Sequence, residues 1–382
     1  MPFRWLGQWL STQDRAIAAK WVQSINPKNY FEAVFDNWAI GQWVKSSVHR
    51  HFRHNVLDLS DHLIASTYGS YLYSGLLACL ALNRLFDEEK PDAQLLFNGR
   101  MGIPRVALEL GKSKGIRTIC EERGYVPGRI MLYDNVNCLD FTGFSNLWSA
   151  WKETPLSREE IDEIGGLLID RWHGRTSDIT LFSPGMVSGQ KLIAALELNP
   201  QLQTWALYTS SLDESVDLES ERDAFPSQYA WIDATVDFVA AHPEIQLVIR
   251  VHPNAGSQKS LGANTQDQDY FQKLTARLPR NVRLIPSDSN HSSYDLAAVS
   301  TLGLIWRSTI GVEMAAMGRK VIRLGAGLLT NAEFMTAPSS QSKYIECLDA
   351  AAHCAPKPDL AEAIKAWRFA CTSAEQSGRV RF

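Results

Sequence analysis

Residues 295–325 constrain the fold more than any other stretch, because they alternate between two strand-like segments and one helical segment. The apolar segments 301–306 and 320–324 have the length and composition of fully buried strands, and a short helical pattern lies between them. Strand, helix and strand at this spacing are typical of a parallel sheet, in which ligands bind beyond the carboxyl ends of the strands. The stretch therefore predicts a ligand site at the turn from the first strand to the helix.

The turn reads Arg307-Ser308-Thr309, and Glu313 follows one helical turn later. Unpaired N–H groups at the start of a helix favour an anion such as phosphate, and a carboxylate nearby can accept a hydrogen bond from a sugar hydroxyl. We interpret the turn as a nucleotide-sugar site. Ser and Thr are also common helix N-caps, and Glu in a first turn complements the helix dipole without a ligand, so capping alone is the alternative.

The same alternation recurs through the second half of the chain. Strands are predicted at 204–209, 245–251 and 282–285, which together with the two above gives a five-stranded sheet of the nucleotide-binding type. The carboxyl ends of parallel strands meet at one edge of a sheet, so the polar residues at these ends are expected to lie together. These residues are Ser210, Ser211, Asp213, Arg250, His252 and Pro253.

The first half of the chain shows a shorter version of this pattern. Strands are predicted at 92–97 and 116–120 with a helix between them, which indicates a second parallel sheet. Polar residues again follow both strands and are expected to share one rim. These residues are Asn98, Arg100, Glu122 and Arg123.

The length of 382 residues favours two domains. We predict an α/β fold with two Rossmann-like domains whose parallel sheets face each other across a cleft. The first domain would span residues 1–198 on the acceptor side, and the second, residues 199–358, would bind the nucleotide sugar. A C-terminal helix within residues 359–382 would pack back on the first domain.

Composition excludes several classes of protein. The formal net charge of −4 gives no general attraction for nucleic acid, so no nucleic-acid partner is expected. Six cysteines without a Cys-x-x-Cys pair indicate reduced thiols rather than a disulfide framework or a zinc site. No apolar run approaches the roughly 18 residues of a membrane span, and the first residues lack the apolar core of a signal peptide. These features predict a cytoplasmic protein.

Residues 1–60 are rich in tryptophan and basic residues, and they end in the cluster His49-Arg-His51-Phe-Arg53-His54. Two interpretations are open. The segment is either a helical flap whose aromatic side chains pack on the first domain, or a surface that rests peripherally on the inner face of the membrane or receives an anionic acceptor. Metal binding is not expected, because no carboxylate is suitably spaced beside the histidines.

Six motifs stand in order along roughly residues 90–330, and they resemble those of the capsule polysaccharide biosynthesis glycosyltransferases of the GT-B architecture. The resemblance implies a GT-B-like fold and a cytoplasmic enzyme that moves a sugar from a nucleotide donor onto a surface glycan or glycolipid. The motifs are Asn98-Gly99-Arg100, Glu122-Arg123-Gly124-Tyr-Val-Pro127, Thr209-Ser-Ser-Leu-Asp-Glu214, Phe225-Pro-Ser-Gln228, Val248-Ile-Arg-Val-His-Pro-Asn254 and Ser308-Thr309 with Glu313.

A narrower resemblance concerns the donor. The His252-Pro253 pair and the Ser-Ser or Ser-Thr pairs are similar to the motifs with which CMP-sugar transferases of this architecture hold the phosphate and the nucleotide. The Kdo-transferring members carry Gln-x-x-x-Asp near the start of the second domain, where this chain has Thr209-Ser-Ser-Leu-Asp213. The chain therefore departs from the Kdo pattern at the Gln position.

Sugar transfer requires donors for the departing phosphate and a base for the acceptor hydroxyl. For the phosphate we predict His252, Arg250 or Arg307 and the Ser308-Thr309 turn. A structural His252 and an Arg250 that points away from the rim are the alternatives. Asp213 and Glu122, one from each domain, are the predicted catalytic carboxylates.

The alternatives for the carboxylates are a helix cap for Asp213 and an ion pair with Arg100 or Arg123 for Glu122. Asn98, Arg100 and Arg123 are predicted on the acceptor side. No metal or other cofactor is expected, because the Asp267-Gln-Asp269 motif lies in a predicted polar loop. A nucleotide-sugar epimerase of the same architecture and a non-catalytic glycan-assembly subunit are the competing functions.

Overall fold

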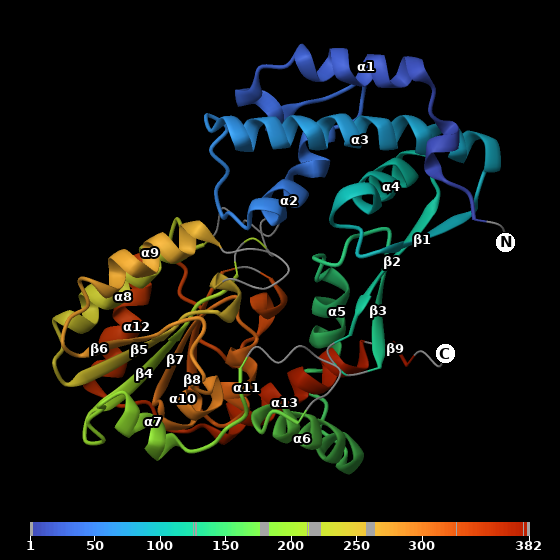
Figure 1. Cartoon of the computed structure of the whole chain (residues 1–382). Helices are drawn as coiled ribbons and strands as arrows, with labels where there is room; N and C mark the ends of the chain where they lie inside the picture. The colour runs from blue at the N-terminus through green and yellow to red at the C-terminus, as the bar shows by residue number, and fades with distance from the viewer. Residues whose placement is uncertain are drawn as a thin grey trace.

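The computed structural model describes residues 3–124, 126, 128–175, 183–211, 213, 223–256, 264–325, 327–376, 378 and 379. Figure 1 shows two α/β lobes, and a layer of N-terminal helices lies on the first lobe. A strand predicted from the sequence at 178–182 lies outside the described residues, as do Tyr125, Pro127, Leu212 and Glu214 of the motifs.

The N-terminal layer is built around one long helix, α3 (His62–Glu89). Asp61 caps its first turn, and Lys90 ends it in the left-handed conformation, directly before Pro91. The helices α1 (Thr12–Gln23) and α2 (Ile40–Phe52) pack against α3. The short helix η1 (Leu6–Trp9) precedes α1 and packs on α3, and η2 (Pro27–Glu32) lies between α1 and α2 and packs on α2 and α3.

The tryptophans of this layer differ in their surroundings. Trp21, Trp38 and Trp43 pack against the core of the layer, which confirms the packing interpretation for these three. Phe3 and Trp5, at the N-terminal end, remain 102% and 82% exposed. The predicted membrane contact of the N-terminal segment therefore depends on Phe3 and Trp5, and it stays a prediction.

The helix α3 corrects one expectation from the sequence. Among the described residues, α3 is the one helix long and apolar enough to cross a membrane, and half of its most apolar window is buried inside the protein. The central helix of a helical layer has the same composition, because it is apolar on several faces. The hydropathy of α3 by itself is therefore not evidence of a membrane span.

The first sheet contains β1 (Ala93–Phe97), β2 (Arg117–Arg123), β3 (Arg129–Asp134) and β9 (Gly378–Arg379), in the order β1-β2-β3-β9. The strands β1 and β2 are parallel and joined through α4 (Gly102–Ser113), as expected. The strands β3 and β9 are antiparallel to their neighbours, so the expected parallel sheet is a mixed one. Only five residues separate β2 from β3, which is too few for the crossover that a parallel β3 would need.

The second sheet contains five parallel strands in the order β6-β5-β4-β7-β8, which confirms the predicted number and direction. One face is covered by α8 (Gln228–Ala240), α9 (Thr265–Thr275) and α12 (Gln341–His353), and the other by α7 (Gly189–Ala195), α10 (Ser293–Val299) and α11 (Ile310–Ala316). The strands are β4 (Gln203–Tyr208), β5 (Ile245–Arg250), β6 (Val282–Ile285), β7 (Leu302–Trp306) and β8 (Lys320–Leu324).

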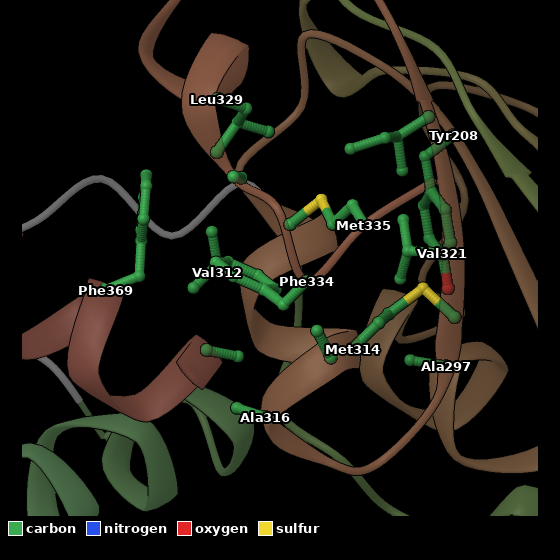
Figure 2. Packing of buried hydrophobic residues seen from close by; sticks show 14 of the residues in the cluster. Tyr208, Ala297, Val312, Met314, Ala316, Val321, Leu329, Phe334, Met335 and Phe369 are labelled. Carbon is green, nitrogen blue, oxygen red and sulfur yellow. The ribbon is translucent and has the colours of Figure 1, made fainter. Parts of the chain in front are cut away.

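Three helices form the junction between the lobes: α5 (Thr142–Trp151), α6 (Arg158–Trp172) and α13 (Leu360–Glu375). Phe369 of α13 lies 4.9 Å from Phe144 and 5.0 Å from Trp148, measured between ring centroids. Figure 2 shows Phe369 of α13 and Val312 of α11, which belong to the same buried apolar cluster. The helix α13 thus packs on α5, α6 and α11, and β9 after it joins the first sheet.

The structure confirms the predicted α/β, GT-B-like fold of two sheet-bearing lobes, with the first sheet mixed rather than parallel. Its second sheet is of the predicted Rossmann-like type, with helices on both faces. The exact domain boundaries at residues 198 and 358 stay predictions.

Candidate functional site

A pocket with a volume of about 250 Å³ lies between the two lobes. Its walls come from the end of β2, from the start of α11 and from α6 and α13. The apolar lining is Val126, Leu167, Leu168, Val312, Leu328, Phe369, Ala370 and Ala374, and the polar lining is Glu122, Arg123, Arg171, Thr309, Glu313 and Ser373. The pocket thus brings together Glu122 and Arg123 of the first lobe with Thr309 and Glu313 of the second.

Thr309 stands at the N-cap position of α11 and lines the pocket. Its side chain makes no capping hydrogen bond, and the residue is exposed. The capping alternative is therefore wrong for Thr309. Its hydroxyl group is placed to donate a hydrogen bond to a ligand in the pocket, whereas Ser308 is not among the lining residues.

Glu313 lies one turn further along α11 and is only 5% exposed. Its Oε1 is 2.8 Å from Nη2 of Arg171, which reaches across from the last turn of α6. The neighbouring Glu313 carboxylate raises the pKa of the Arg171 guanidinium. Burial, together with Glu313, raises the pKa of Tyr294 beside them. The carboxylate of Glu313, predicted to bind a sugar, therefore lies in the pocket wall and is paired with the guanidinium of Arg171.

Arg171 was missed by the sequence reasoning. A signal for it exists, because Arg171 follows the buried Ile164 and Leu168 at helical spacing and so continues the inward face of α6. A charged residue on such a face needs a partner from another element, and that partner is Glu313.

Replacing Arg171 by methionine should lower the free energy of unfolding by about 1 to 3 kcal/mol, because the buried Glu313 carboxylate loses its charged donor. The double variant Arg171→Met with Glu313→Gln should recover most of that loss. Urea denaturation of the wild type, of the single variants Arg171→Met and Glu313→Gln and of the double variant measures the coupling. Equal stability of Arg171→Met and the wild type would contradict an ionic pair at this place.

Glu122 faces the pocket from the first lobe, at the end of β2. Its Oε2 accepts a hydrogen bond of 2.5 Å from Nδ2 of Asn98, and its Oε1 accepts one of 2.9 Å from the backbone N–H of Arg123. These bonds, rather than the alternative ion pair with Arg100 or Arg123, hold the carboxylate. Arg123 lies at the exposed rim of the pocket.

Asp213 lies in a separate cluster and is itself completely buried. Its Oδ2 is 2.7 Å from Nη1 of Arg50 and 3.8 Å from Nε of Arg53, and its Oδ1 accepts a 2.6 Å hydrogen bond from Ser211. Its backbone carbonyl accepts a 2.8 Å hydrogen bond from Nη2 of Arg100. A carboxylate with no exposed surface is closed to an acceptor hydroxyl, so this placement argues against the predicted role of Asp213 as a base.

Two arginines of this cluster come from the C-terminal end of α2, which is far from Asp213 in the sequence. Arg53 also donates hydrogen bonds to the backbone carbonyls of Asn254 and Gly256 in the second lobe. The basic run at the end of the N-terminal segment was visible in the sequence, but its partner was not. The segment therefore joins the two lobes through Arg50 and Arg53.

His252 and Pro253 begin the short helix η5 (Pro253–Ala255). Nδ1 of His252 accepts a 3.1 Å hydrogen bond from the backbone N–H of Asn254, and the backbone N–H of His252 donates to the Thr209 hydroxyl at 2.8 Å. Burial, followed by the nearby Arg250, lowers the pKa of His252 to about 4. The pocket lining does not include His252. Thr309 lines this pocket and His252 does not, so a joint contact of His252 and Thr309 with one phosphate stays a prediction.

This low pKa makes stability depend on pH. His252 is neutral in the folded protein at neutral pH and gains a proton more readily when unfolded, so its contribution is complete above about pH 6.5 and is lost as the pH falls toward 4. The lost stability should reach about 3 kcal/mol. Denaturation of His252→Gln and the wild type at pH 7.5 and pH 4.5 measures it, with His62→Gln as the control at an exposed site.

The wild type should lose more stability than His252→Gln on acidification, and His62→Gln should behave like the wild type. Equal losses for the wild type and His252→Gln would show that His252 takes up its proton as easily when folded as when unfolded.

The remaining predicted donor-binding residues tie strand ends together. Ser210 donates to the carbonyl of Trp306 and so links β4 to β7. Arg250 donates to the carbonyl of Pro286 at 2.5 Å, and burial lowers its pKa. Arg307 pairs with Asp223 at 2.8 Å. These residues lie at the predicted edge of the sheet, but their polar groups bond to other residues of the protein.

Asn98 and Arg100 connect the two clusters. Asn98 bonds to Glu122 in the pocket wall, and Arg100 bonds to the backbone of Asp213. Both residues are buried, at 9% and 5% exposure. The predicted contact of Asn98 and Arg100 with an acceptor is therefore not supported, since both side chains are enclosed.

No protein-family model and no curated protein matches the chain. Among solved structures, the chain is similar to Thermosulfurimonas dismutans KpsC, a beta Kdo 2,4 transferase, with 15% identity, 72% of this chain and 78% of that chain covered, and a TM-score of 0.44. It is also similar to the UDP-GlcNAc 2-epimerase from Neisseria meningitidis bound to UDP-GlcNAc, with 13% identity, 78% of each chain covered and a TM-score of 0.31.

A third similar structure is the spinosyn rhamnosyltransferase SpnG complexed with spinosyn aglycone, with 12% identity, 92% of this chain and 82% of that chain covered, and a TM-score of 0.34. All three TM-scores lie below 0.5, so we derive the function of this chain from its own site.

Proposed function

We propose that the protein is a glycosyltransferase that moves a sugar from a nucleotide-sugar donor to a hydroxyl group of a surface glycan or glycolipid. One observation carries the proposal: a single interlobe pocket is lined by Glu122 at the end of β2 and by Thr309 and Glu313 after β7. A transferase needs donor and acceptor groups on opposite walls of one cleft. The order of the sequence motifs, which resembles that of capsule polysaccharide glycosyltransferases, supports the same class.

The second lobe would hold the donor. The Thr309 hydroxyl and the Arg171 guanidinium supply hydrogen-bond donors for the leaving phosphate, and Glu313 accepts from a sugar hydroxyl. The apolar lining from Val312 and Phe369 excludes water around the base or the sugar ring. We assign donor binding to Thr309, Glu313 and Arg171, in place of His252 and Arg250.

The first lobe would supply the base. The acceptor oxygen attacks the anomeric carbon, the bond from that carbon to the phosphate oxygen breaks with its electron pair on the phosphate, and Glu122 takes the acceptor proton. Of the three residues predicted on the acceptor side, Arg123 is the exposed one, and we assign contact with the acceptor to it. In the described part of the chain, no group of three or more His, Cys, Asp or Glu side chains could hold a metal ion. We assign charge neutralisation to the protein donors Thr309 and Arg171.

The competing functions are distinguished by a reaction assay. The purified protein is incubated with CMP-, UDP-, GDP- and TDP-sugars, with and without a glycolipid extract as the acceptor. A transferase should release the nucleotide faster with the extract than without it. Formation of an isomeric sugar nucleotide without any extract would instead support the epimerase, and neither reaction with any donor would support the non-catalytic subunit.

A further inference from the structure

Asn98 forms a hydrogen bond with Glu122, the proposed base, and its other polar groups also have hydrogen-bond partners. Its backbone N–H donates to the carbonyl of Glu121 at 2.7 Å, and its own carbonyl accepts from the N–H of Cys138 at 3.0 Å. Its Oδ1 accepts from the N–H of Arg100 at 3.0 Å, and its Nδ2 donates to Oε2 of Glu122 at 2.5 Å. The side chain is therefore fixed in one orientation.

The backbone conformation of Asn98 is energetically unfavourable. Its φ of 65° lies in the left-handed region, which costs free energy for a residue other than glycine. Gly99 follows at φ 65°, where an added Cβ would lie 2.4 Å from Sγ of Cys120, so the turn passes close to the sheet. Asparagine tolerates this conformation better than most residues, and it also supplies the amide donor.

The bonding pattern sets which end of the amide faces Glu122. The Arg100 N–H needs an acceptor, so the amide oxygen must face Arg100 and the amide nitrogen must face Glu122. Arg100 is in turn held by Ser46 at 2.8 Å and by the carbonyl of Asp213 at 2.8 Å. The buried Asp213 cluster thereby anchors the turn that carries Asn98.

We propose that Asn98 is a positioning residue that orients the Glu122 carboxylate toward the pocket. This inference rests on the proposed function, in which Glu122 is the base. Each Glu122 oxygen accepts one bond on the protein side, which leaves further lone pairs for the acceptor hydroxyl. Rotation of the carboxylate away from the acceptor would slow proton transfer without removing the donor site.

The test uses a donor and acceptor swap. Asn98→Asp keeps the acceptor for Arg100 but places a carboxylate against Glu122. Asn98→Asp with Glu122→Gln restores a hydrogen bond, because the amide introduced at position 122 then donates to the carboxylate introduced at position 98. Asn98→Gly removes the side chain while accepting the left-handed backbone. Asn29→Asp adds the same charge at an exposed site and is the control.

We expect Asn98→Asp to lower the melting temperature by about 2 to 8 °C, and the double variant to recover most of that loss. For nucleotide release from the donor that the wild type uses, we expect kcat to fall about tenfold or more in Asn98→Asp and Asn98→Gly, with KM for the donor unchanged. The double variant should recover stability but not turnover. Asn29→Asp should match the wild type in both.

Two results would overturn the positioning role. The first is the absence of stability coupling between positions 98 and 122, which needs no substrate to measure. The second is turnover in Asn98→Asp or Asn98→Gly at the wild-type kcat. Nucleotide binding is measured separately by thermal shift, and Asn98 does not line the pocket. If the wild type binds none of the nucleotides, the result counts against the proposed function. If positions 98 and 122 show no stability coupling, the result counts against the positioning role of Asn98.

Discussion

Replacing Asp213 by alanine is expected to lower the free energy of unfolding by about 3 to 5 kcal/mol, the largest loss of stability from any single ion pair described here. Asp213 has no exposed surface, and Arg53 beside it is 1% exposed. Removing the carboxylate leaves buried positive charge that water does not reach. The contact between α2 and the second lobe should weaken with it, since Arg50 and Arg53 both lie at the end of α2.

The control for this prediction is Asp162→Ala. Asp162 pairs with Arg158 on the surface of α6, where the two side chains are 65% and 83% exposed. An exposed pair of this kind contributes about 0.5 kcal/mol or less. Urea denaturation at pH 7.5 compares both variants with the wild type. If Asp213→Ala were no less stable than Asp162→Ala, the buried cluster would not join the lobes as the structure indicates.

Replacing Glu122 by glutamine is expected to reduce turnover by about 100- to 10,000-fold, because the acceptor hydroxyl loses its base. The amide oxygen of glutamine can still accept from Asn98, so the fold and donor binding should change little. Glu121→Gln is the matched control, since neighbouring residues of a strand point to opposite faces of the sheet.

Initial rates of acceptor-dependent nucleotide release measure the effect of the Glu122 change. A Glu122→Gln variant with the turnover of Glu121→Gln would remove Glu122 from the catalytic role. The proposed donor site, formed by Thr309, Glu313 and Arg171, would then need a base from elsewhere in the cleft.

The second sheet could be predicted from the sequence because its strands are buried on both faces. Such strands are continuous apolar runs, and β5 and β7 are buried at every residue. In the first sheet, β3 alternates buried and exposed residues after a glycine-containing turn, and β9 has only two residues. Neither pattern stands out from a loop, so the antiparallel half of the first sheet was not predicted.

Part of the pocket lining could be predicted from the rule that ligands bind at the carboxyl ends of parallel strands. Glu122, Arg123, Thr309 and Glu313 line one pocket, as residues that follow strands of facing sheets should. The same rule also selected Asp213 and His252, because it cannot show which strand ends are covered by another segment. At Asp213 the cover is α2, which precedes it by more than a hundred residues.

Residues on helices escaped this rule altogether. Arg171 enters the pocket from α6, and Arg50 and Arg53 enter the buried cluster from the end of α2. Their roles follow from which helix packs on which lobe, and that packing is a property of the whole fold. Sequence periodicity indicates only that such residues face inward.

The most direct test of the central claim is a thermal-shift panel of CMP, UDP, GDP and TDP on three proteins. These are the wild type, Ala370→Trp, which fills the pocket, and Ala361→Trp, which adds the same side chain on the exposed face of α13. A ligand that binds only the folded state at about 100 times its Kd adds about 2.7 kcal/mol of stability.

The account predicts that one nucleotide raises the melting temperature of the wild type and of Ala361→Trp by about 3 °C or more and leaves Ala370→Trp unchanged. A flat response of the wild type to all four nucleotides, or an undiminished shift in Ala370→Trp, would contradict a nucleotide-sugar site between the lobes.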